Sequence, residues 1–297
     1  MAKRKRKDKA TKLISFIIVI ILALIFTYGD KIFDKAETYD SDVRVHFIDV
    51  GQGSATLVSY GKNGILIDTG EAEYGTYLFD YIDSCGVTAL DYVIASHPHS
   101  DHIGSMADII KKYPIGTFIM PELSEMNTPT TRVYEKMLVA LAEKDVNVEL
   151  SETGAVYKAA EGISFRVFGP CKQVSDLNDM SVIVKLTVNG TSFMVLADAE
   201  KQELSSVYES YPNLDYRSDV LAMGHHGSST SIDDKFLSAV NADVAVISCG
   251  RDNKYGHPHR EALQYVKEEK MTLYRTDNDG DIVFLCTSDG YERVDSK

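Results

Sequence analysis

The chain has 297 residues, of which 44% are hydrophobic and 25% are charged, a composition typical of a globular protein that buries one large core. Its formal net charge is −13, and because residues 1–12 contribute a net +6, the rest of the chain carries −19. Such an acidic surface does not attract polyanions at long range, which argues against a protein that coats DNA without sequence preference.

The N-terminus has the arrangement of an export signal. A basic segment, Lys3–Lys9, precedes an uncharged apolar run from Leu13 to Tyr28. A helix over residues 13–29 is at the lower end of the ~17–25 residues that cross hydrocarbon, and the positive-inside rule keeps residues 1–12 in the cytoplasm. We therefore expect a transmembrane signal-anchor and a single-pass protein of the cell membrane with an exported domain. The alternative is a cleaved signal peptide and a secreted protein.

Residues 30–42 are charged and lack periodicity, which predicts a short linker before one folded domain at residues 43–297. The hydrophobic pattern of that domain alternates between strands and helices. Strands are expected at 43–49, 54–60, 64–68, 90–95, 163–168, 182–188, 192–196, 220–223, 244–248 and 272–274, and helices at 77–85, 103–112, 131–144, 203–211 and 233–240. This alternation predicts a layered α/β sandwich.

The four cysteines have no CxxC spacing, so neither a zinc knuckle nor a disulfide-dense scaffold is indicated. Cys249 and Cys286 end apolar, strand-like runs, where a small buried side chain is the expected role. One or two disulfides are the alternative if the domain is exported.

Three histidines and a carboxylate, His97, His99, Asp101 and His102, follow directly after the strand expected at 90–95. Histidines two positions apart on an extended backbone point to the same side and can share one cation, while Asp101 and His102 can reach a second. Ser100 is a candidate N-cap for the following helix. The cluster predicts two metal ions a few ångströms apart, against the alternative of a solvated histidine-rich loop.

These four residues match in full the HxHxDH motif of the metallo-β-lactamase superfamily, which the sequence resembles. Further runs are similar to the hydrolase domain of ComEC-like competence proteins, and together they span nearly the whole domain. They are Phe47–Gly53, Ile67–Gly70, Asn178–Ser181, Leu196–Asp198, Gly224–Ser228 and Tyr255–Pro258. The resemblance implies a four-layer αββα sandwich with a binuclear metal site.

The resemblance also implies the roles of single residues. Asp198 would bridge both metals, Asp101 and Asp198 would be the catalytic carboxylates, and at least one of His225 and His226 would complete a coordination sphere. His257 is similar to a final histidine that contacts metal or substrate. Two further carboxylates, Asp49 and Asp68, are expected beside the cleft as supports for ligand histidines. His46, inside the first strand, is expected to be structural.

The sequence departs from the family pattern at two places. The family often draws a ligand from between the HxHxDH motif and the bridging aspartate, but no histidine lies between His102 and His225. Either a member of the 225/226 pair substitutes for it or one metal is held more weakly. Ser54 stands where an aspartate commonly follows the GQG motif, which leaves the chemistry of that position open.

Two cations sharing Asp198 would also share a water, lower its pKa and direct it at phosphorus or at a carbonyl carbon. Zinc suits the imidazole-rich set, and manganese is the alternative once carboxylates are counted. The expected substrate is a phosphodiester, in nucleic acid or in a cell-wall polymer, and no protein partner is implied. The alternatives are a β-lactam or amide hydrolase and a non-catalytic, metal-stabilised surface module that assists DNA uptake.

Overall fold

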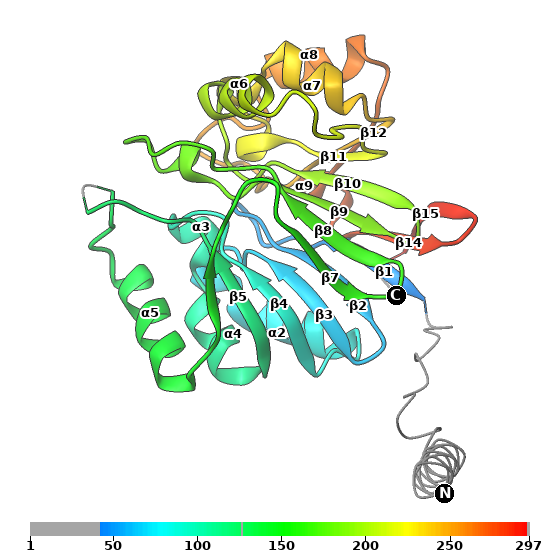
Figure 1. The fold of residues 1–297 in the computed structure, drawn as a ribbon. Helices are drawn as coiled ribbons and strands as arrows, with labels where there is room; N and C mark the ends of the chain where they lie inside the picture. The colour runs from blue at the N-terminus through cyan, green and yellow to red at the C-terminus, as the bar shows by residue number, and fades with distance from the viewer. Residues whose placement is uncertain (1–41, 126, 296–297) are drawn as a thin grey trace, which may run out of the picture. The chain divides into compact units, whose positions relative to one another are not determined.

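Two β-sheets lie face to face in the computed structural model, which describes residues 42–125 and 127–295, and helices cover the outer side of each sheet (Figure 1). These residues belong to one compact unit, Ser41–Lys297. The signal-anchor expected at residues 13–29 and the basic segment before it lie outside the described residues. Within the described ranges, no helix is long and apolar enough to cross a membrane.

The first sheet has the strand order β15-β14-β1-β2-β3-β4-β5-β6. Its strands are β1 (Val43–Phe47), β2 (Thr56–Tyr60), β3 (Asn63–Ile67), β4 (Ala89–Ile94), β5 (Ile115–Met120), β6 (Val148–Leu150), β14 (Ile282–Thr287) and β15 (Gly290–Val294). The second sheet has the order β13-β12-β11-β10-β9-β8-β7. Its strands are β7 (Val156–Ala160), β8 (Ile163–Val167), β9 (Val184–Val188), β10 (Thr191–Val195), β11 (Val220–Ala222), β12 (Val244–Ile247) and β13 (Thr272–Arg275).

The helices divide between the two sheets. Those packed on the first sheet or at its edge are α2 (Gly75–Ser84), α3 (Ser100–Ile103), α4 (Met106–Lys112) and α5 (Arg132–Lys144). Those packed on the second sheet are α6 (Lys201–Ser210), α7 (Asp234–Val240) and α8 (Arg260–Glu268), and a short α9 (Thr276–Asp279) links β13 to β14. Each long helix turns an apolar stripe toward its sheet and a polar face toward solvent.

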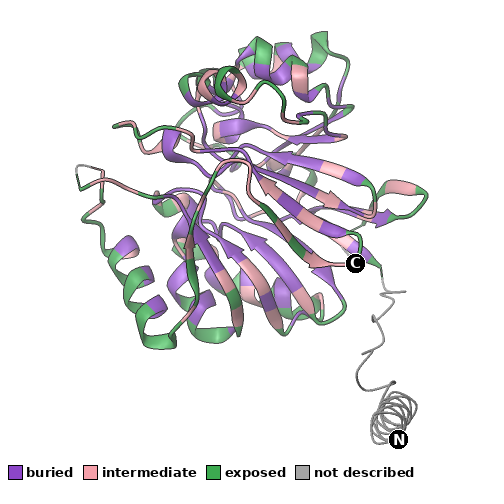
Figure 2. Cartoon of the chain, viewed as in Figure 1, coloured by how far each residue is buried: buried purple, intermediate pink, exposed green. Residues whose placement is uncertain are grey.

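Burial follows these layers, as Figure 2 shows by the buried residues along both sheets. One hydrophobic cluster joins the first sheet to α2, α4 and α5, and a second joins the other sheet to α6, α7 and α8. Between the sheets, the rings of Phe47 and Phe193 lie 6.4 Å apart and those of Tyr92 and Phe165 lie 5.1 Å apart. The structure is therefore a four-layer αββα sandwich, as the family resemblance implied.

Strand direction determines where loops can meet. Strands β3 to β6 run parallel in the first sheet, and β10 to β13 run parallel in the second. Parallel strands end at the same edge of a sheet, and loops at that edge are the usual place for a functional site in an open α/β sheet. The loops that contain Asp68, the HxHxDH motif, Asp198 and the 225/226 pair all follow such strands.

Two local expectations were wrong. The helix expected at 103–112 is two helices, α3 and α4, because the chain turns at Gly104 and Ser105. Ser100 is not the N-cap of α3, since that position belongs to His99, and the Ser100 hydroxyl instead donates to Glu71 Oε1 at 2.9 Å.

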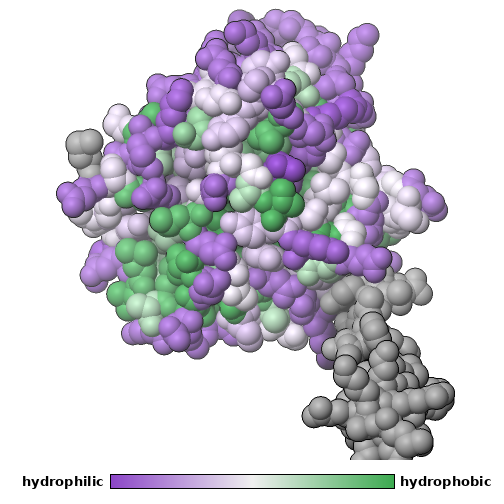
Figure 3. All heavy atoms as spheres, viewed as in Figure 1, coloured by the Kyte–Doolittle hydropathy of each residue, from purple (hydrophilic) through white to green (hydrophobic). Residues whose placement is uncertain are grey.

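The outer edge of the first sheet exposes apolar side chains. Figure 3 shows them at the lower left, over α5, and the exposed large residues there are Leu138 and Val139 of α5 with Val148 and Leu150 of β6.

The cysteines are unpaired within the part of the chain that the structure describes, and Cys249 and Cys286 are buried, as expected of small core side chains.

Candidate metal centre

Four residues with left-handed backbone conformations surround the candidate site. Asp68 (φ 61°) follows β3, Ala197 (φ 48°) follows β10, and His225 and His226 (φ 48° and 56°) follow β11. Residues other than glycine adopt this conformation at a cost of about 1–2 kcal/mol each, and such strain tends to gather at functional sites. Here it turns the chain sharply at each strand end, so that side chains from both sheets face one place.

Asp198 lies at the centre of the histidines, and its two carboxylate oxygens face different partners. Oδ1 is 3.1 Å from His102 Nε2 and 3.6 Å from His226 Nε2. Oδ2 is 3.7 Å from His97 Nε2 and also 3.7 Å from His225 Nε2. Because each oxygen has its own set of imidazoles, the carboxylate can serve two cations at once.

Two groups of side chains in the described residues have the spacing of a metal site. The first is Asp101, His102, Asp198 and His226, whose ligand atoms all lie within 4.8 Å of one another. The second is His97, His99 and Asp198, within the same limit. The structure thus brings together six of the eight expected ligands in two groups that share Asp198.

The hydrogen bonds of the imidazoles leave one lone pair free on each. His102 Nδ1 donates to Asp68 Oδ2 at 2.7 Å, and His226 Nδ1 donates to the carbonyl oxygen of Ser248 at 2.9 Å. Such bonds to an acceptor fix the tautomer, so in the neutral form of both rings Nε2 carries the lone pair. Nε2 therefore faces Asp198 in the form that a metal ion requires.

Three buried atoms without hydrogen-bond partners show whether these residues fit a cation. His102 Nε2, His226 Nε2 and Asp198 Oδ1 are all buried and have no hydrogen-bond partner of suitable geometry among the described residues. Buried polar atoms are nearly always paired, and these three converge on one point. All three are lone-pair donors of the kinds that bind divalent transition metals, so the residues fit such an ion.

The charges at the centre depend strongly on one another. Burial works against a charged Asp198, but the neighbouring His102 and His226 hold its pKa well below the ordinary value. Burial also opposes a charged His102, yet Asp198 and Asp68 raise its pKa well above the ordinary value. Burial lowers the pKa of His97 well below the ordinary value. A proton and a metal ion therefore compete for His102 Nε2.

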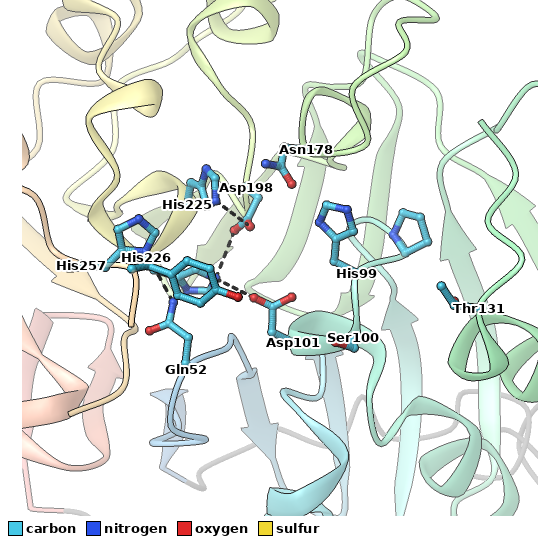
Figure 4. A pocket seen from close by; sticks show the side chains of 12 residues that line it. Gln52, His99, Ser100, Asp101, Thr131, Asn178, Asp198, His225, His226 and His257 are labelled. Atoms are coloured by element: carbon cyan, nitrogen blue, oxygen red, sulfur yellow. Dashed lines mark hydrogen bonds and ion pairs between the residues drawn. The ribbon is translucent and has the colours of Figure 1, made fainter. Parts of the chain in front are cut away.

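A cavity of about 410 Å³ opens beside these groups and is lined by Gln52, Pro98, His99, Ser100, Asp101, Thr131, Asn178, Asp198, His225, His226, Tyr255 and His257. Figure 4 shows Asp198 with His225 and His226 on one side and His99 on the other. The cavity gives a substrate access to both groups of candidate ligands.

His225 and His257 are the two expected ligands outside these groups. His225 Nδ1 lies 3.0 Å from Glu200 Oε1, which leaves Nε2 directed at Asp198 Oδ2. His257 contacts Gln52 Nε2 through Nδ1 at 3.5 Å, and its ring centre is 5.4 Å from that of His225. His257 therefore lines the cavity from the wall next to the histidine cluster.

The supporting carboxylates behave differently from each other. Asp68 is fully buried and supports His102, as predicted, and it also accepts bonds from the backbone and hydroxyl of Ser96. The prediction that Asp49 also supports a ligand histidine was wrong, because its carboxylate accepts the backbone N–H of Gly51 at 3.2 Å and so holds the GQG loop. That loop needs Gly53, where a Cβ would lie 2.5 Å from the carbonyl oxygen of Asp101.

Sequence reasoning missed three residues that contact the candidate ligands. The Ser96 and Ser181 hydroxyls lie 3.1 and 3.3 Å from His97 Nδ1, and Glu200 contacts His225. Ser96 and Glu200 are each within two positions of a candidate ligand, and Ser181 ends the family-like run Asn178–Ser181, so each of the three residues carried a usable signal. His46 is structural as expected, since it is buried with its ring between Tyr81 and Ser59.

The chain is similar to known proteins over most of its length. Residues 48–165 match the model of the metallo-beta-lactamase superfamily. The chain is 27% identical to ComE operon protein 3 of Bacillus subtilis, over 96% of this chain and 37% of that protein. It is 29% identical to competence protein ComA of Neisseria gonorrhoeae, over 82% of this chain and 32% of that protein. The chain thus spans about a third of the length of these relatives.

Among solved structures, the metallo-beta-lactamase fold protein YhfI from Bacillus subtilis superposes with a TM-score of 0.52 at 14% identity. The match covers 79% of this chain and 96% of YhfI. At that identity the likeness concerns the fold alone, and it agrees with the four-layer sandwich.

Proposed function

We propose that this chain, which has a metallo-β-lactamase domain similar to that of ComEC-like competence proteins, is a binuclear metal-dependent phosphodiesterase. The observation that carries the proposal is the division of Asp198 between two sets of imidazoles, Oδ1 toward His102 and His226 and Oδ2 toward His97 and His225. A carboxylate with this arrangement is suited to bridge two cations.

Each candidate ligand has a separate task. His97, His99 and Asp198 would hold one cation, with His225 as an added nitrogen, and Asp101, His102, Asp198 and His226 would hold the other. When bound, two divalent cations activate a water and neutralise charge on a phosphoryl oxygen. Asp68 keeps His102 in the tautomer with a free Nε2, and the carbonyl of Ser248 does the same for His226.

His257 is the group best placed to contact the substrate. Gln52 Oε1 accepts the backbone N–H of Gly250 at 3.1 Å, so its Nε2 is the donor that faces His257 Nδ1. This leaves Nε2 of His257 as an N–H donor for a substrate oxygen. Burial lowers the pKa of His257 to about 4, so the ring is neutral at pH 7.

A phosphodiester is favoured over a β-lactam or another amide. The names of two relatives refer to the ComE operon and to competence, and the resemblance to competence proteins is our reason for preferring a phosphodiester. The net charge of −19 beyond residue 12 disfavours tight, nonspecific DNA binding, so a small or locally recognised phosphodiester is an equal candidate with extracellular nucleic acid or a wall polymer. We place the domain outside the cell, held at the membrane through residues 13–29.

The test is hydrolysis of bis-p-nitrophenyl phosphate by the full chain, with its metal content measured. The Asp198→Ala and His99→Ala variants should lose turnover to the background rate, while His259→Ala should keep it. His259 is a suitable matched control because its ring bonds to Ser229 and to the carbonyl oxygen of Tyr255 and lies outside both groups. A chromogenic β-lactam serves as the competing substrate.

Metal-loaded protein that leaves the diester intact would overturn the proposal. Turnover of the β-lactam in its place would indicate an amide hydrolase. Inactivity on both substrates would favour a metal-stabilised binding module. Zinc and manganese are tried separately, because the mixed imidazole and carboxylate set accepts either ion.

A further inference from the structure

We infer that the side-chain carbonyl of Asn178 is an additional ligand of the cation held by His97, His99 and Asp198, and that Glu200 positions it. This inference rests on the metal binding in the proposed function and not on the reaction. It concerns the region in which the sequence lacks the family's usual histidine.

Asn178 begins a 3₁₀ turn, Asn178–Met180, that is fastened to the centre on two sides. On one side, the hydroxyl of Ser181 lies 3.3 Å from His97 Nδ1 and accepts the backbone N–H of Asp198 at 3.2 Å. On the other side, Asp179 accepts the backbone N–H of Glu200 at 2.9 Å. The turn therefore cannot move independently of the histidines, and the position of Asn178 is fixed by the backbone.

The orientation of the amide follows from its one partner. Asn178 Nδ2 donates to Glu200 Oε1 at 3.3 Å, and because a carboxylate oxygen only accepts, the nitrogen must be the atom on that side. Oδ1 then points the other way. It is buried, has no hydrogen-bond partner among the described residues, and belongs to a residue that lines the cavity. An amide oxygen in this state is a ready lone-pair donor for a cation.

Figure 4 shows Asn178 beside Asp198, between His225 and His99. This is the side of Asp198 on which Oδ2 faces His97 and His225. The carbonyl therefore belongs to the His97 and His99 group and not to the group around Asp101.

Glu200 holds three donors with one carboxylate oxygen. Its Oε1 accepts from Asn178 Nδ2, from the hydroxyl of Thr230 at 3.0 Å and from His225 Nδ1 at 3.0 Å. The same carboxylate thus directs the Asn178 carbonyl and the His225 lone pair toward one cation. Glu200 is a positioning residue, because it acts on the cation only through Asn178 and His225. Together these two side chains supply what a histidine between His102 and Asp198 would supply.

The experiment measures metal affinity of the full chain and needs no substrate. Metal-free protein is titrated with Zn²⁺ by calorimetry and with Co²⁺ by visible absorption, which reports the ligands around the ion. The test variants are Asn178→Leu, which keeps the approximate shape without polar atoms, and Asn178→His, which keeps both a donor for Glu200 and a lone pair. The matched control is Asn147→Leu, an exposed asparagine bound to Thr117 and Glu149.

Asn178→Leu should bind one of the two ions about 10–100-fold more weakly, by the scale of losses at supporting residues, and should leave the other ion unchanged. Its Co²⁺ spectrum should change as well. Asn178→His should regain most of the lost affinity, and Glu200→Gln should weaken the same ion as Asn178→Leu. Asn147→Leu should match the parent.

Equal affinities and spectra for Asn178→Leu and the parent would overturn the inference, and so would Asn178→His that is as weak as Asn178→Leu. A protein that binds two ions with this pattern but hydrolyses no diester would refute only the proposed function. Diester hydrolysis with unchanged metal binding in Asn178→Leu would refute only the inference.

Discussion

Replacing Asp68 by asparagine tests how the protein prepares His102 for a metal ion. The buried carboxylate accepts three bonds, from the Ser96 backbone N–H at 2.8 Å, the Ser96 hydroxyl at 2.7 Å and His102 Nδ1 at 2.7 Å. The first reaches Oδ1 and the other two reach Oδ2. An asparagine has one oxygen and one amide nitrogen in these places, so it cannot accept all three bonds.

Each orientation of the new amide has a defined cost. If its nitrogen faces the Ser96 backbone, two donors oppose each other in a buried place, which costs about 1–3 kcal/mol of folding free energy. If its nitrogen faces His102, the ring must accept at Nδ1 and carry its proton on Nε2, where the lone pair for the metal should be. Metal affinity then falls by about 10–100-fold, the range measured when the partner of a ligand histidine is removed.

The assay is a metal titration of the full-length Asp68→Asn variant, with urea unfolding of the metal-free protein beside it. Asp91→Asn is the control, because Asp91 also accepts bonds, from Tyr60 at 2.7 Å and from Asn63, but lies within β4 and belongs to neither group of candidate ligands. The control should lose stability and keep its metal affinity. Parental affinity for both ions in Asp68→Asn would refute the role of Asp68 in selecting the tautomer.

Three further predictions concern pH, packing and metal removal. Burial lowers the pKa of His46 to about 3, whereas the pKa of a histidine in the unfolded chain is about 6.5. Between these two values only the unfolded chain takes up the proton. The free energy of unfolding should therefore fall by up to about 1.4 kcal/mol per pH unit as the pH drops toward 3. In urea unfolding of the metal-free protein, His46→Gln should show a shallower slope over this range, and parallel curves would contradict the assignment. Gly104→Ala should lower the free energy of unfolding by about 1–3 kcal/mol in the same assay. The new Cβ would lie 2.4 Å from the backbone nitrogen of Ala72 and 2.6 Å from the carbonyl oxygens of Gly70 and Ser100. Unchanged stability would show that the backbone of this turn can shift to accept a Cβ. Chelation should lower the melting temperature of the parent, because each ion present at 100 times its Kd adds about 2.7 kcal/mol of stability, and it should lower that of Asp198→Asn by less, because this variant holds at most one ion.

Much of the fold and the core of the site could be predicted from short-range patterns. Apolar runs that end in Asp68, His97 or Asp198 gave the strands and placed these side chains at strand ends. Because the strands are parallel, their ends meet, and the pairing of distant motifs follows from topology. The spacing of the HxHxDH motif also predicted that its residues divide between two metal ions.

The remaining details depend on backbone angles and on long-range contacts. His225 and His226 are adjacent, and only their left-handed conformations show that both can face Asp198, each toward a different oxygen. Asp49 and Asp68 look alike in sequence, since each ends an apolar strand, but only Asp68 contacts a histidine. Glu200 is an ordinary acidic residue before a helix until its three donors are brought together by the fold.

We propose that Asp198 bridges two cations, and elemental analysis of the purified full chain measures how many ions the bridge holds. The parent should hold two divalent ions per chain, and Asp198→Asn, which keeps the shape of the side chain, should hold at most one. Two ions retained by Asp198→Asn, or a parent that holds none after purification with metal supplied, would show that Asp198 is not a bridging ligand.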